Sequence, residues 1–236
     1  MQKMKKKLGI IGGLGPMASA LFLQILTAQT DAGRDQEHLE ALLYSRPQTP
    51  DRTAFLLGKS QDNPLPVMLD SGRQLENMGC DVLVIPCMTA YGFYDQLKTA
   101  FQAELINPIT ESARVLKARG CKAVGIMATD GTLQVGTFQK ALAAEGIRPV
   151  IPDSGNQREV MSLIYDDVKS GKDADMERFH AVAHSMRAQG AECVILGCTE
   201  LSVINYRHEI GHGFLDAMEV LAQCAITACG YQVKQS

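Results

Sequence analysis

Two cysteines occupy matching positions in the sequence, each shortly after an apolar run. Cys87 comes after the run 82–85 and Cys198 after the run 194–196, and a threonine follows each within two residues. In a parallel sheet, ligands bind at the carboxyl ends of the strands. A thiol placed there, near a helix N-terminus, has a lowered pKa and ionises more readily. The two thiols are therefore the first candidates for acid–base chemistry.

Two acid–base groups on opposite faces of one carbon can invert a stereocentre. One thiolate removes the proton, and the other thiol delivers a proton to the opposite side. The alternative is that both cysteines are ordinary buried thiols at strand ends. We expect that role for the other five, and we predict that each can be replaced by Ala or Ser with little loss of turnover: Cys80, Cys121, Cys193, Cys224 and Cys229.

The chain repeats part of itself, and the repeat includes both cysteines. Segments 78–87 and 189–198 each have a helix end, a glycine, an acidic residue, an apolar run and then cysteine. Glycine and cysteine are eight residues apart in both (87 − 79 and 198 − 190). Segment 8–15 resembles 124–131 in the same order along the chain. The two pairs predict a duplication, although all strand–turn–helix units share some likeness.

The expected elements define an α/β protein with two similar lobes related by a pseudo-two-fold axis. Apolar runs without alternation are typical of parallel strands buried on both faces, and we expect strands at 8–11, 41–44, 82–85, 123–127 and 194–196. Helical periodicity separates them at 18–30, 70–78, 111–118, 137–145 and 175–189. We assign residues 1–105 with 214–236 to the first lobe and 106–213 to the second. Each lobe is a parallel sheet flanked by helices, with the active site in the cleft between them.

Composition and charge exclude several classes of protein. With 236 residues, 46% of them hydrophobic, the chain can bury a core and is not intrinsically disordered. A net charge of −3 and the absence of Trp argue against a nucleic-acid partner. Residues 1–28 resemble a signal peptide, but glycines and Pro16 interrupt the apolar run, and we expect no membrane helix. Seven cysteines, an odd number, fit a reducing cytoplasm better than a disulfide framework.

A glycine-rich turn follows the first expected strand. Segment 13–18 resembles a dinucleotide-binding turn but lacks the third glycine in place. We expect Gly13 and Gly15 instead to let the substrate or the opposite lobe approach the backbone closely. Thr129, Gly131 and Thr132 either do the same in the second lobe or form a simple N-cap.

Three charged side chains are further candidates. Arg52, in a turn at 49–53, is either a carboxylate-binding residue or an ordinary surface arginine. Asp51 either supports Cys87 as an acid–base neighbour or caps the helix that we expect at 54–59. The same two roles are open for Glu200 beside Cys198.

The histidines do not form a metal-binding pattern. His180 and His184 share a helix face, as zinc ligands do. However, no glutamate follows His180 as it does in zinc metalloproteases, and the surrounding sequence is polar. We predict no metal site.

Five motifs together resemble the aspartate/glutamate racemase family of cofactor-independent amino-acid racemases, over nearly the whole chain. They are Gly9-Ile10-Ile11-Gly12-Gly13-Leu14-Gly15-Pro16, Pro50-Asp51-Arg52-Thr53, Pro86-Cys87-Met88-Thr89-Ala90, Ala128-Thr129-Asp130-Gly131-Thr132 and Leu196-Gly197-Cys198-Thr199-Glu200-Leu201. The resemblance implies two α/β lobes with the site between them and a homodimer. It also implies that Cys87 and Cys198 are the catalytic pair, working without pyridoxal phosphate, metal or other cofactor.

The resemblance further implies which residues bind the substrate. Arg52 would hold a carboxylate, and Lys169, otherwise a normal helix-end lysine before Gly171, would supply a second cation for a dicarboxylic amino acid. The α-carboxylate would lie on backbone N–H groups after the cysteines, with the hydroxyls of Thr89 and Thr199. The expected substrate-binding residues also include Gly13, Met88 and Thr129.

The sequence departs from the family after the first cysteine, where Asn-Thr-Ala-His is common and Met88-Thr89-Ala90-Tyr91 is present here. Met88 lacks an amide donor, and Tyr91 cannot act as histidine does near neutral pH. We predict a cytoplasmic racemase that acts on aspartate or glutamate by two-base proton transfer. Two alternatives stay open. One is another enzyme of the superfamily, such as a hydantoin racemase, a maleate isomerase or a decarboxylase-like protein; the other is a non-catalytic dicarboxylate binder.

Overall fold

The computed structural model describes residues 5–235 as two parallel sheets of four strands each. The first sheet has the order β2-β1-β3-β4 and the second β6-β5-β7-β8, so both have the same topology. The strands are β1 (Leu8–Gly12), β2 (Ala41–Ser45), β3 (Val82–Val84), β4 (Glu104–Leu105), β5 (Ala123–Met127), β6 (Arg148–Val150), β7 (Cys193–Leu196) and β8 (Phe214–Asp216). Residues 1–4, which open the segment resembling a signal peptide, lie outside the described part of the chain.

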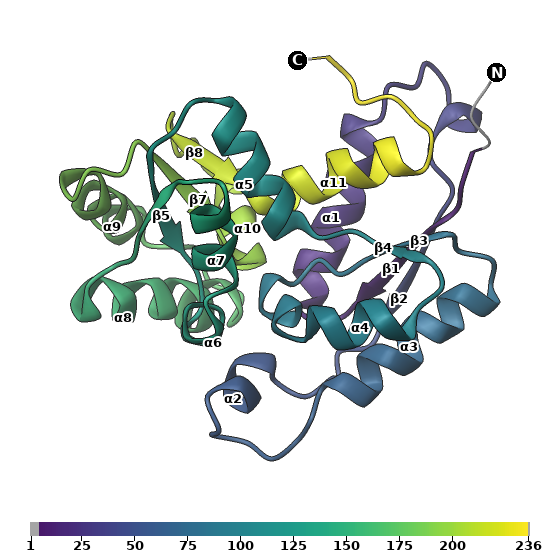
Figure 1. The fold of residues 1–236 in the computed structure, drawn as a ribbon, viewed down its shortest axis with the longest axis horizontal. Helices are drawn as coiled ribbons and strands as arrows, with labels where there is room; N and C mark the ends of the chain where they lie inside the picture. The colour runs from purple at the N-terminus through teal and green to yellow at the C-terminus, as the bar shows by residue number, and fades with distance from the viewer. Residues whose placement is uncertain (1–4, 236) are drawn as a thin grey trace.

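Helices connect the strands and flank the two sheets, which confirms the predicted fold class (Figure 1). They are α1 (Pro16–Gln29), α2 (Arg52–Leu56), α3 (Leu65–Asn77), α4 (Tyr94–Ala100), α5 (Pro108–Ala118), α6 (Asp130–Val135), α7 (Thr137–Ala144), α8 (Ser154–Ser162), α9 (Met176–Ala188), α10 (Thr199–Arg207) and α11 (Ala217–Ala228). Two further helical turns matter for the site: a 3₁₀ segment, η2 (Met88–Phe93), and a π-helical turn, η3 (Leu163–Val168). Within residues 5–235, no helix has the length and apolar character needed to cross a bilayer.

Burial explains which strands the sequence reveals. The central strands β1, β3, β5 and β7 are buried along their whole length, and their sequences are continuously apolar. The sequence analysis missed the edge strands β4, β6 and β8. Each has only two or three residues, and a run that short carries no periodic signal.

The last helix of each repeat lies at the junction of the lobes. Helix α5 follows β4 and packs against α7 of the second lobe, whereas α11 follows β8 and packs against α1 of the first. The two helices also contact each other, and Figure 1 shows them at the junction between the sheets. Strand β8 pairs with β7, so residues 214–216 belong to the second sheet and not, as predicted, to the first lobe. The other lobe boundaries stay a prediction.

The five cysteines assigned to the core are all free thiols. Cys80, Cys193 and Cys229 are buried, and Cys121 and Cys224 are half-buried. Burial raises the pKa of Cys193 and Cys224 to about 11. These two thiols therefore stay protonated at neutral pH and pack as small apolar groups.

Burial of Cys229 is expected to lower the free energy of unfolding at alkaline pH. Burial raises the pKa of Cys229 to about 12, whereas a thiol in an unfolded chain titrates near ~8.5. At lower pH both states hold the proton. Between the two values only the unfolded chain loses it, so the free energy of unfolding falls as pH rises. Urea denaturation at about pH 7.5 and pH 10 should show this loss, and Cys229→Ala should reduce it. An unchanged pH dependence in the variant would contradict the burial of this thiol.

Candidate active site

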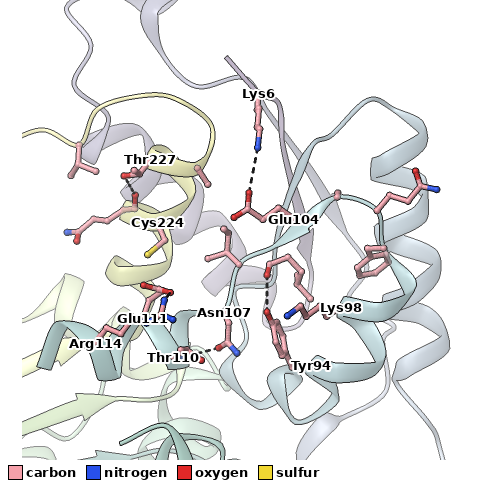
Figure 2. Close-up of a pocket in the computed structure, with 18 residues that line it drawn as sticks. Lys6, Tyr94, Lys98, Glu104, Asn107, Thr110, Glu111, Arg114, Cys224 and Thr227 are labelled. Atoms are coloured by element: carbon pink, nitrogen blue, oxygen red, sulfur yellow. Dashed lines mark hydrogen bonds and ion pairs between the residues drawn. The ribbon is translucent and has the colours of Figure 1, made fainter. Parts of the chain in front are cut away.

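Two cavities compete as the candidate site. The larger, of about 1120 Å³, is bordered by α4, β4, α5 and α11 (Figure 2). Four of its charged side chains form two ion pairs: Lys6 Nζ lies 3.6 Å from Glu104 Oε2, and Arg114 binds Glu111. The fifth, Lys98, lies over the Tyr94 ring. No residue predicted for the site lines this cavity. Because its main charges neutralise one another, we place the candidate site in the other cavity.

The other cavity lies between the lobes, beside the carboxyl ends of β3 and β7, and both Cys87 and Cys198 line it. Except for Gly13, every predicted site residue lines it: Cys87, Cys198, Arg52, Thr89, Thr199, Lys169, Met88, Thr129, Asp51 and Glu200. Three residues that the sequence analysis did not assign to the site complete the wall: Leu14, Thr53 and Tyr165. The cavity volume is about 10 Å³, which holds about one water molecule. We call it the inner pocket.

The two cysteines have equivalent backbone positions. Cys87 is the N-cap residue of η2 and Cys198 is the N-cap residue of α10, and both have extended backbone, with φ of −159° and −141°. Neither side chain caps its helix. The repeat therefore delivers one thiol from each lobe to the same pocket.

Glu200 links Cys198 to Lys169. The thiol of Cys198 donates to Glu200 Oε2, with 2.9 Å between Sγ and Oε2, and Lys169 Nζ lies 2.8 Å from Glu200 Oε1. The Glu200 side chain is only 6% exposed, so its charge depends on these partners. Gly15 leaves room for it, because a Cβ there would lie 2.8 Å from Glu200 Oε1. Glu200 thus contacts the cysteine thiol directly instead of capping α10.

The surroundings raise the pKa of Cys198, contrary to the prediction made from its place at a helix N-terminus. Burial disfavours the thiolate and the charge of Glu200 repels it, and both outweigh the attraction of Lys169. Burial lowers the pKa of Lys169, but the charge of Glu200 and a thiolate at Cys198 would raise it, and the net shift is upward. At neutral pH Cys198 is therefore a thiol and Lys169 an ammonium.

Arg52 is buried against backbone carbonyls and is not a surface arginine. Its Nη1 donates to the carbonyls of Thr49 (3.2 Å) and Pro50 (3.0 Å), and its Nη2 donates to that of Leu14 (3.0 Å). The buried Nε–H has no partner. Burial lowers the pKa of Arg52, but nearby negative charge, first that of a Cys87 thiolate, raises it overall. A guanidinium has five N–H donors, so the Nε–H and one Nη2–H remain for an anion.

Asp51 and Tyr165 connect the lobes beside Arg52. Asp51 Oδ1 accepts from the N–H of Ala54 (2.7 Å) and caps α2, while the Tyr165 hydroxyl lies 3.4 Å from Asp51 Oδ2. Burial raises the pKa of Tyr165 to about 12, so its phenol is a donor. The sequence held a signal for Tyr165, because it precedes Lys169 by four residues, a spacing that places two side chains on one helix face. In the structure the Tyr165 ring lies 5.4 Å from Lys169 Nζ.

Three threonine hydroxyls form a ring across the cleft. Thr89 of the first lobe and Thr129 and Thr132 of the second lie 3.0 Å apart in each pair of Oγ1 atoms. Thr129 also caps α6 by accepting from the N–H of Thr132 at 3.3 Å. Thr199 donates to Glu200 Oε2 at 3.4 Å. The three hydroxyls of the ring satisfy one another's hydrogen-bonding capacity.

The two residues that depart from the family motif have different positions. Met88 is buried at 2% exposure and lines the inner pocket. Tyr91 does not line it; its hydroxyl accepts from the backbone N–H of Ile85 at 3.3 Å, and burial raises its pKa. Tyr91 therefore closes the end of β3, and only Met88 changes the pocket wall.

The glycines separate into two groups. A Cβ on Gly13 would lie 2.3 Å from the backbone nitrogen of Arg46, and its φ is +86°. Gly13 therefore serves a tight turn within the first lobe and does not line the inner pocket; its predicted contact with the substrate stays a prediction. Gly131 and Gly15 do permit the opposite lobe to approach: a Cβ on Gly131 would lie 2.9 Å from Thr53 Cα.

Potential metal ligands are dispersed. Within residues 5–235, no group of three or more His, Cys, Asp or Glu side chains is arranged to hold an ion. His180 packs its ring edge-on against Phe179, and His208 pairs with Asp173 at 2.9 Å. The chemistry that this arrangement supports is proton transfer between thiols and carboxylates.

Comparisons with known proteins identify the family. The family model described as Asp/Glu/Hydantoin racemase matches residues 11–225. The structure of the Picrophilus torridus aspartate racemase is 32% identical, covers 97% of this chain and 96% of that chain, and has a TM-score of 0.85. The broad specificity amino-acid racemase RacX of Bacillus subtilis is 23% identical over 95% of this chain and 99% of its own length.

A more distant structure supports the fold alone. The glutamate racemase of Francisella tularensis in complex with D-glutamate is 12% identical, covers 95% of this chain and 80% of that chain, and has a TM-score of 0.69. It has the same two-lobed α/β architecture. The match over residues 11–225 and the full-length likeness to racemases show that this chain belongs to the Asp/Glu/hydantoin racemase family and that its class is that of the isomerases.

Proposed function

We propose that the protein is a cofactor-independent amino-acid racemase that inverts acidic amino acids, aspartate or glutamate, by two-base proton transfer. The observation that carries this proposal is the convergence of Cys87 and Cys198, one from each repeat, on one pocket between the lobes. Thiols contributed by two different lobes can reach opposite faces of one α-carbon bound between them. The named relatives that racemise aspartate, glutamate or a range of amino acids support the same chemistry.

The unequal surroundings of the two thiols set the order of events. In the closed site Cys198 holds its proton and donates a hydrogen bond to Glu200. Cys198 is therefore the acid in the half-reaction that starts from this state, and Cys87 is the base that removes the α-proton. The positive charge near Cys87 comes from Arg52, whose guanidinium lies close enough for a Cys87 thiolate to raise its pKa.

Glu200 supports Cys198 in the reverse direction. When Cys198 must remove a proton, its own proton has to leave first, and Glu200 Oε2 at 2.9 Å is the acceptor in contact with it. Lys169 then balances the charge on Glu200 and Cys198. Deprotonation in this direction therefore needs both members of the ion pair.

Recognition of the substrate divides between its two ends. We propose that Arg52 and Lys169 bind the side-chain carboxylate, since Arg52 keeps two donors free. The α-carboxylate lies at the backbone N–H groups that follow the cysteines, with Thr89, Thr129 and Thr199 adding hydroxyls. The inner pocket has room for about one water molecule, so the lobes must separate to admit the substrate and open the threonine ring.

The cellular compartment and the assembly remain proposals. Seven free cysteines, of which five lie outside the inner pocket, support a reducing compartment and therefore the cytoplasm. The homodimer rests on the family resemblance alone.

Exchange of the α-proton tests the two-base reaction. Incubation of L- and D-aspartate and of L- and D-glutamate in D₂O should give α-deuteration together with inversion. Cys87→Ser and Cys198→Ser should each abolish inversion, by more than ~1000-fold, because each removes one of the two bases. Cys121→Ser is the matched control and should keep the wild-type rate. Binding of all four amino acids with no exchange would instead identify a non-catalytic dicarboxylate binder.

The ion pair makes a separate prediction about thiol titration. Glu200→Gln removes the negative charge that opposes the Cys198 thiolate, so the pKa of Cys198 should fall and its thiolate should form at lower pH. Thiolate absorbance near 240 nm, followed against pH, measures this shift. Subtraction of the Cys198→Ser titration isolates the contribution of Cys198. A titration that stays the same or moves to higher pH in Glu200→Gln would refute the assigned electrostatics.

Arg52→Lys tests the carboxylate site. Lysine keeps the charge but cannot satisfy three carbonyls and also present a planar pair of donors. We expect KM for glutamate to rise by about tenfold or more, the equivalent of ~1.4 kcal/mol. The matched control is Arg73→Lys, at an exposed arginine of α3, with an unchanged KM. Thermal unfolding of both variants separates a binding defect from misfolding, and an unaltered KM in folded Arg52→Lys would remove Arg52 from the binding site.

A further inference from the structure

A second cavity adjoins the inner pocket on its outer side, and we propose that it binds the distal carboxylate of acidic amino acids longer than aspartate. The proposal rests on the racemase function above, because the α-carbon has to lie between the two cysteines. This outer cavity has a volume of about 390 Å³ and shares Asp51, Arg52, Lys169 and Glu200 with the inner pocket. A side chain that leaves the inner pocket past Arg52 and Lys169 therefore enters it.

The start of helix α1 forms one wall of the outer cavity. Gly13, Gly15, Pro16, Met17 and Ala18 line it. Helix α1 has fourteen residues, its N-cap Gly15 supplies no side-chain cap, and no acidic residue lies in its first turn. Pro16, the first residue, has no N–H, so the N–H groups of Met17 and Ala18 are the ones available to an anion, and the helix dipole favours negative charge there. The glycine turn at 13–18, which resembles a dinucleotide-binding turn, would thus bind an anion.

Arg52 points to the same ligand independently. The residue is 8% exposed, it lines the outer cavity, and its buried Nε has no hydrogen-bond partner. Leaving a buried charged donor unpaired costs free energy, and a carboxylate removes that cost. Around this cavity, donors for an anion are left at the α1 N-terminus, at Arg52 and on the Lys169 ammonium, which has three donors and is paired with Glu200.

The other charged groups that face the cavity already have partners. Asp51 caps α2 and meets the Tyr165 hydroxyl, while Glu200 is paired with Lys169 and with the Cys198 thiol. Their negative charges are compensated, so they do not cancel the attraction of Arg52 and α1 for an anion.

The remaining wall is apolar and fixes the class of side chain. Pro16, Met17, Pro47, Val168 and Val203 lie around the cavity. Such a wall stabilises methylene groups between the α-carbon and a terminal carboxylate. Aspartate, with one methylene, is too short to use it, whereas glutamate and 2-aminoadipate carry two and three. The geometry therefore ranks 2-aminoadipate and glutamate above aspartate.

Unreactive dicarboxylates test the outer cavity without relying on catalysis. Isothermal titration of the full-length protein with succinate, glutarate and adipate should give Kd values that fall as the chain lengthens. Met17→Glu adds a negative charge at the α1 N-terminus, where Met17 is 60% exposed, and acidic residues favour the fold there. Met17→Glu should raise the Kd for adipate by a factor at least tenfold larger than the factor for succinate. Met78→Glu is the matched control. Met78 is 58% exposed and lies beside Lys7, at the opposite end of the first sheet. All Kd values of Met78→Glu should therefore equal those of the wild type.

The outcomes separate the outer cavity from the racemase function. Length-dependent binding that only Met17→Glu disrupts supports the outer cavity, even if no amino acid exchanges its α-proton and the racemase proposal fails. Equal Kd values across the series, equal effects of Met17→Glu and Met78→Glu, or no binding of any dicarboxylate would each overturn the outer cavity. Exchange of aspartate in D₂O together with any of these results would leave the racemase function standing alone.

Discussion

The ion pair between the buried Glu200 and the more exposed Lys169 is the interaction on which the site depends. Glu200 is almost fully enclosed, and without Lys169 this carboxylate would lack an oppositely charged partner, which is unfavourable for a buried charge. The pair in turn fixes the protonation of Cys198, since a neutral or displaced Glu200 would no longer accept its proton. Gly15 of the first lobe leaves space for Glu200. A group from the opposite lobe is thus part of the environment of this thiol.

The duplicated topology explains how two lobes supply matched thiols without equal chemistry. Both sheets have the same strand order, and the third strand of each repeat leads to a cysteine at an N-cap. The segments after the two cysteines differ, because Cys198 precedes a nine-residue helix that carries Glu200, whereas Cys87 precedes a 3₁₀ turn. Helices α5 and α11 pack across the junction and against each other (Figure 1). The junction therefore holds two lobes of the same topology together, while the residues after each cysteine give the two thiols different surroundings.

Sequence patterns anticipated the buried parts of the fold and most of the pocket, because both depend on local signals. The central strands are continuous apolar runs, and the cysteines repeat at a fixed distance from a glycine. The edge strand β8 could not be assigned, because its membership of the second sheet is set by pairing with β7. The raised pKa of Cys198 was also out of reach. A helix N-terminus lowers a thiol pKa in isolation, but burial and Glu200 decide here, and burial depends on the closure of the two lobes. The close packing of Gly13 against the Arg46 backbone could not be predicted for a similar reason, since Arg46 comes from a distant turn.

Met88 changes the chemistry of the inner-pocket wall next to Cys87. Its side chain fills a wall position where the family commonly has an amide, and it offers neither the donors nor the acceptor of an amide. Apart from the Arg52 guanidinium, the polar groups near Cys87 are hydroxyls of the threonine ring, which pair with one another. Donors without partners are the Nε–H of Arg52 and the first N–H groups of α1. Unpaired buried donors contribute more to selectivity than paired ones, because a ligand lacking their partner leaves them unsatisfied. We therefore expect the proposed racemase to discriminate among substrates mainly at the far end of the substrate side chain, with the two thiols in their proposed acid–base role at the α-carbon.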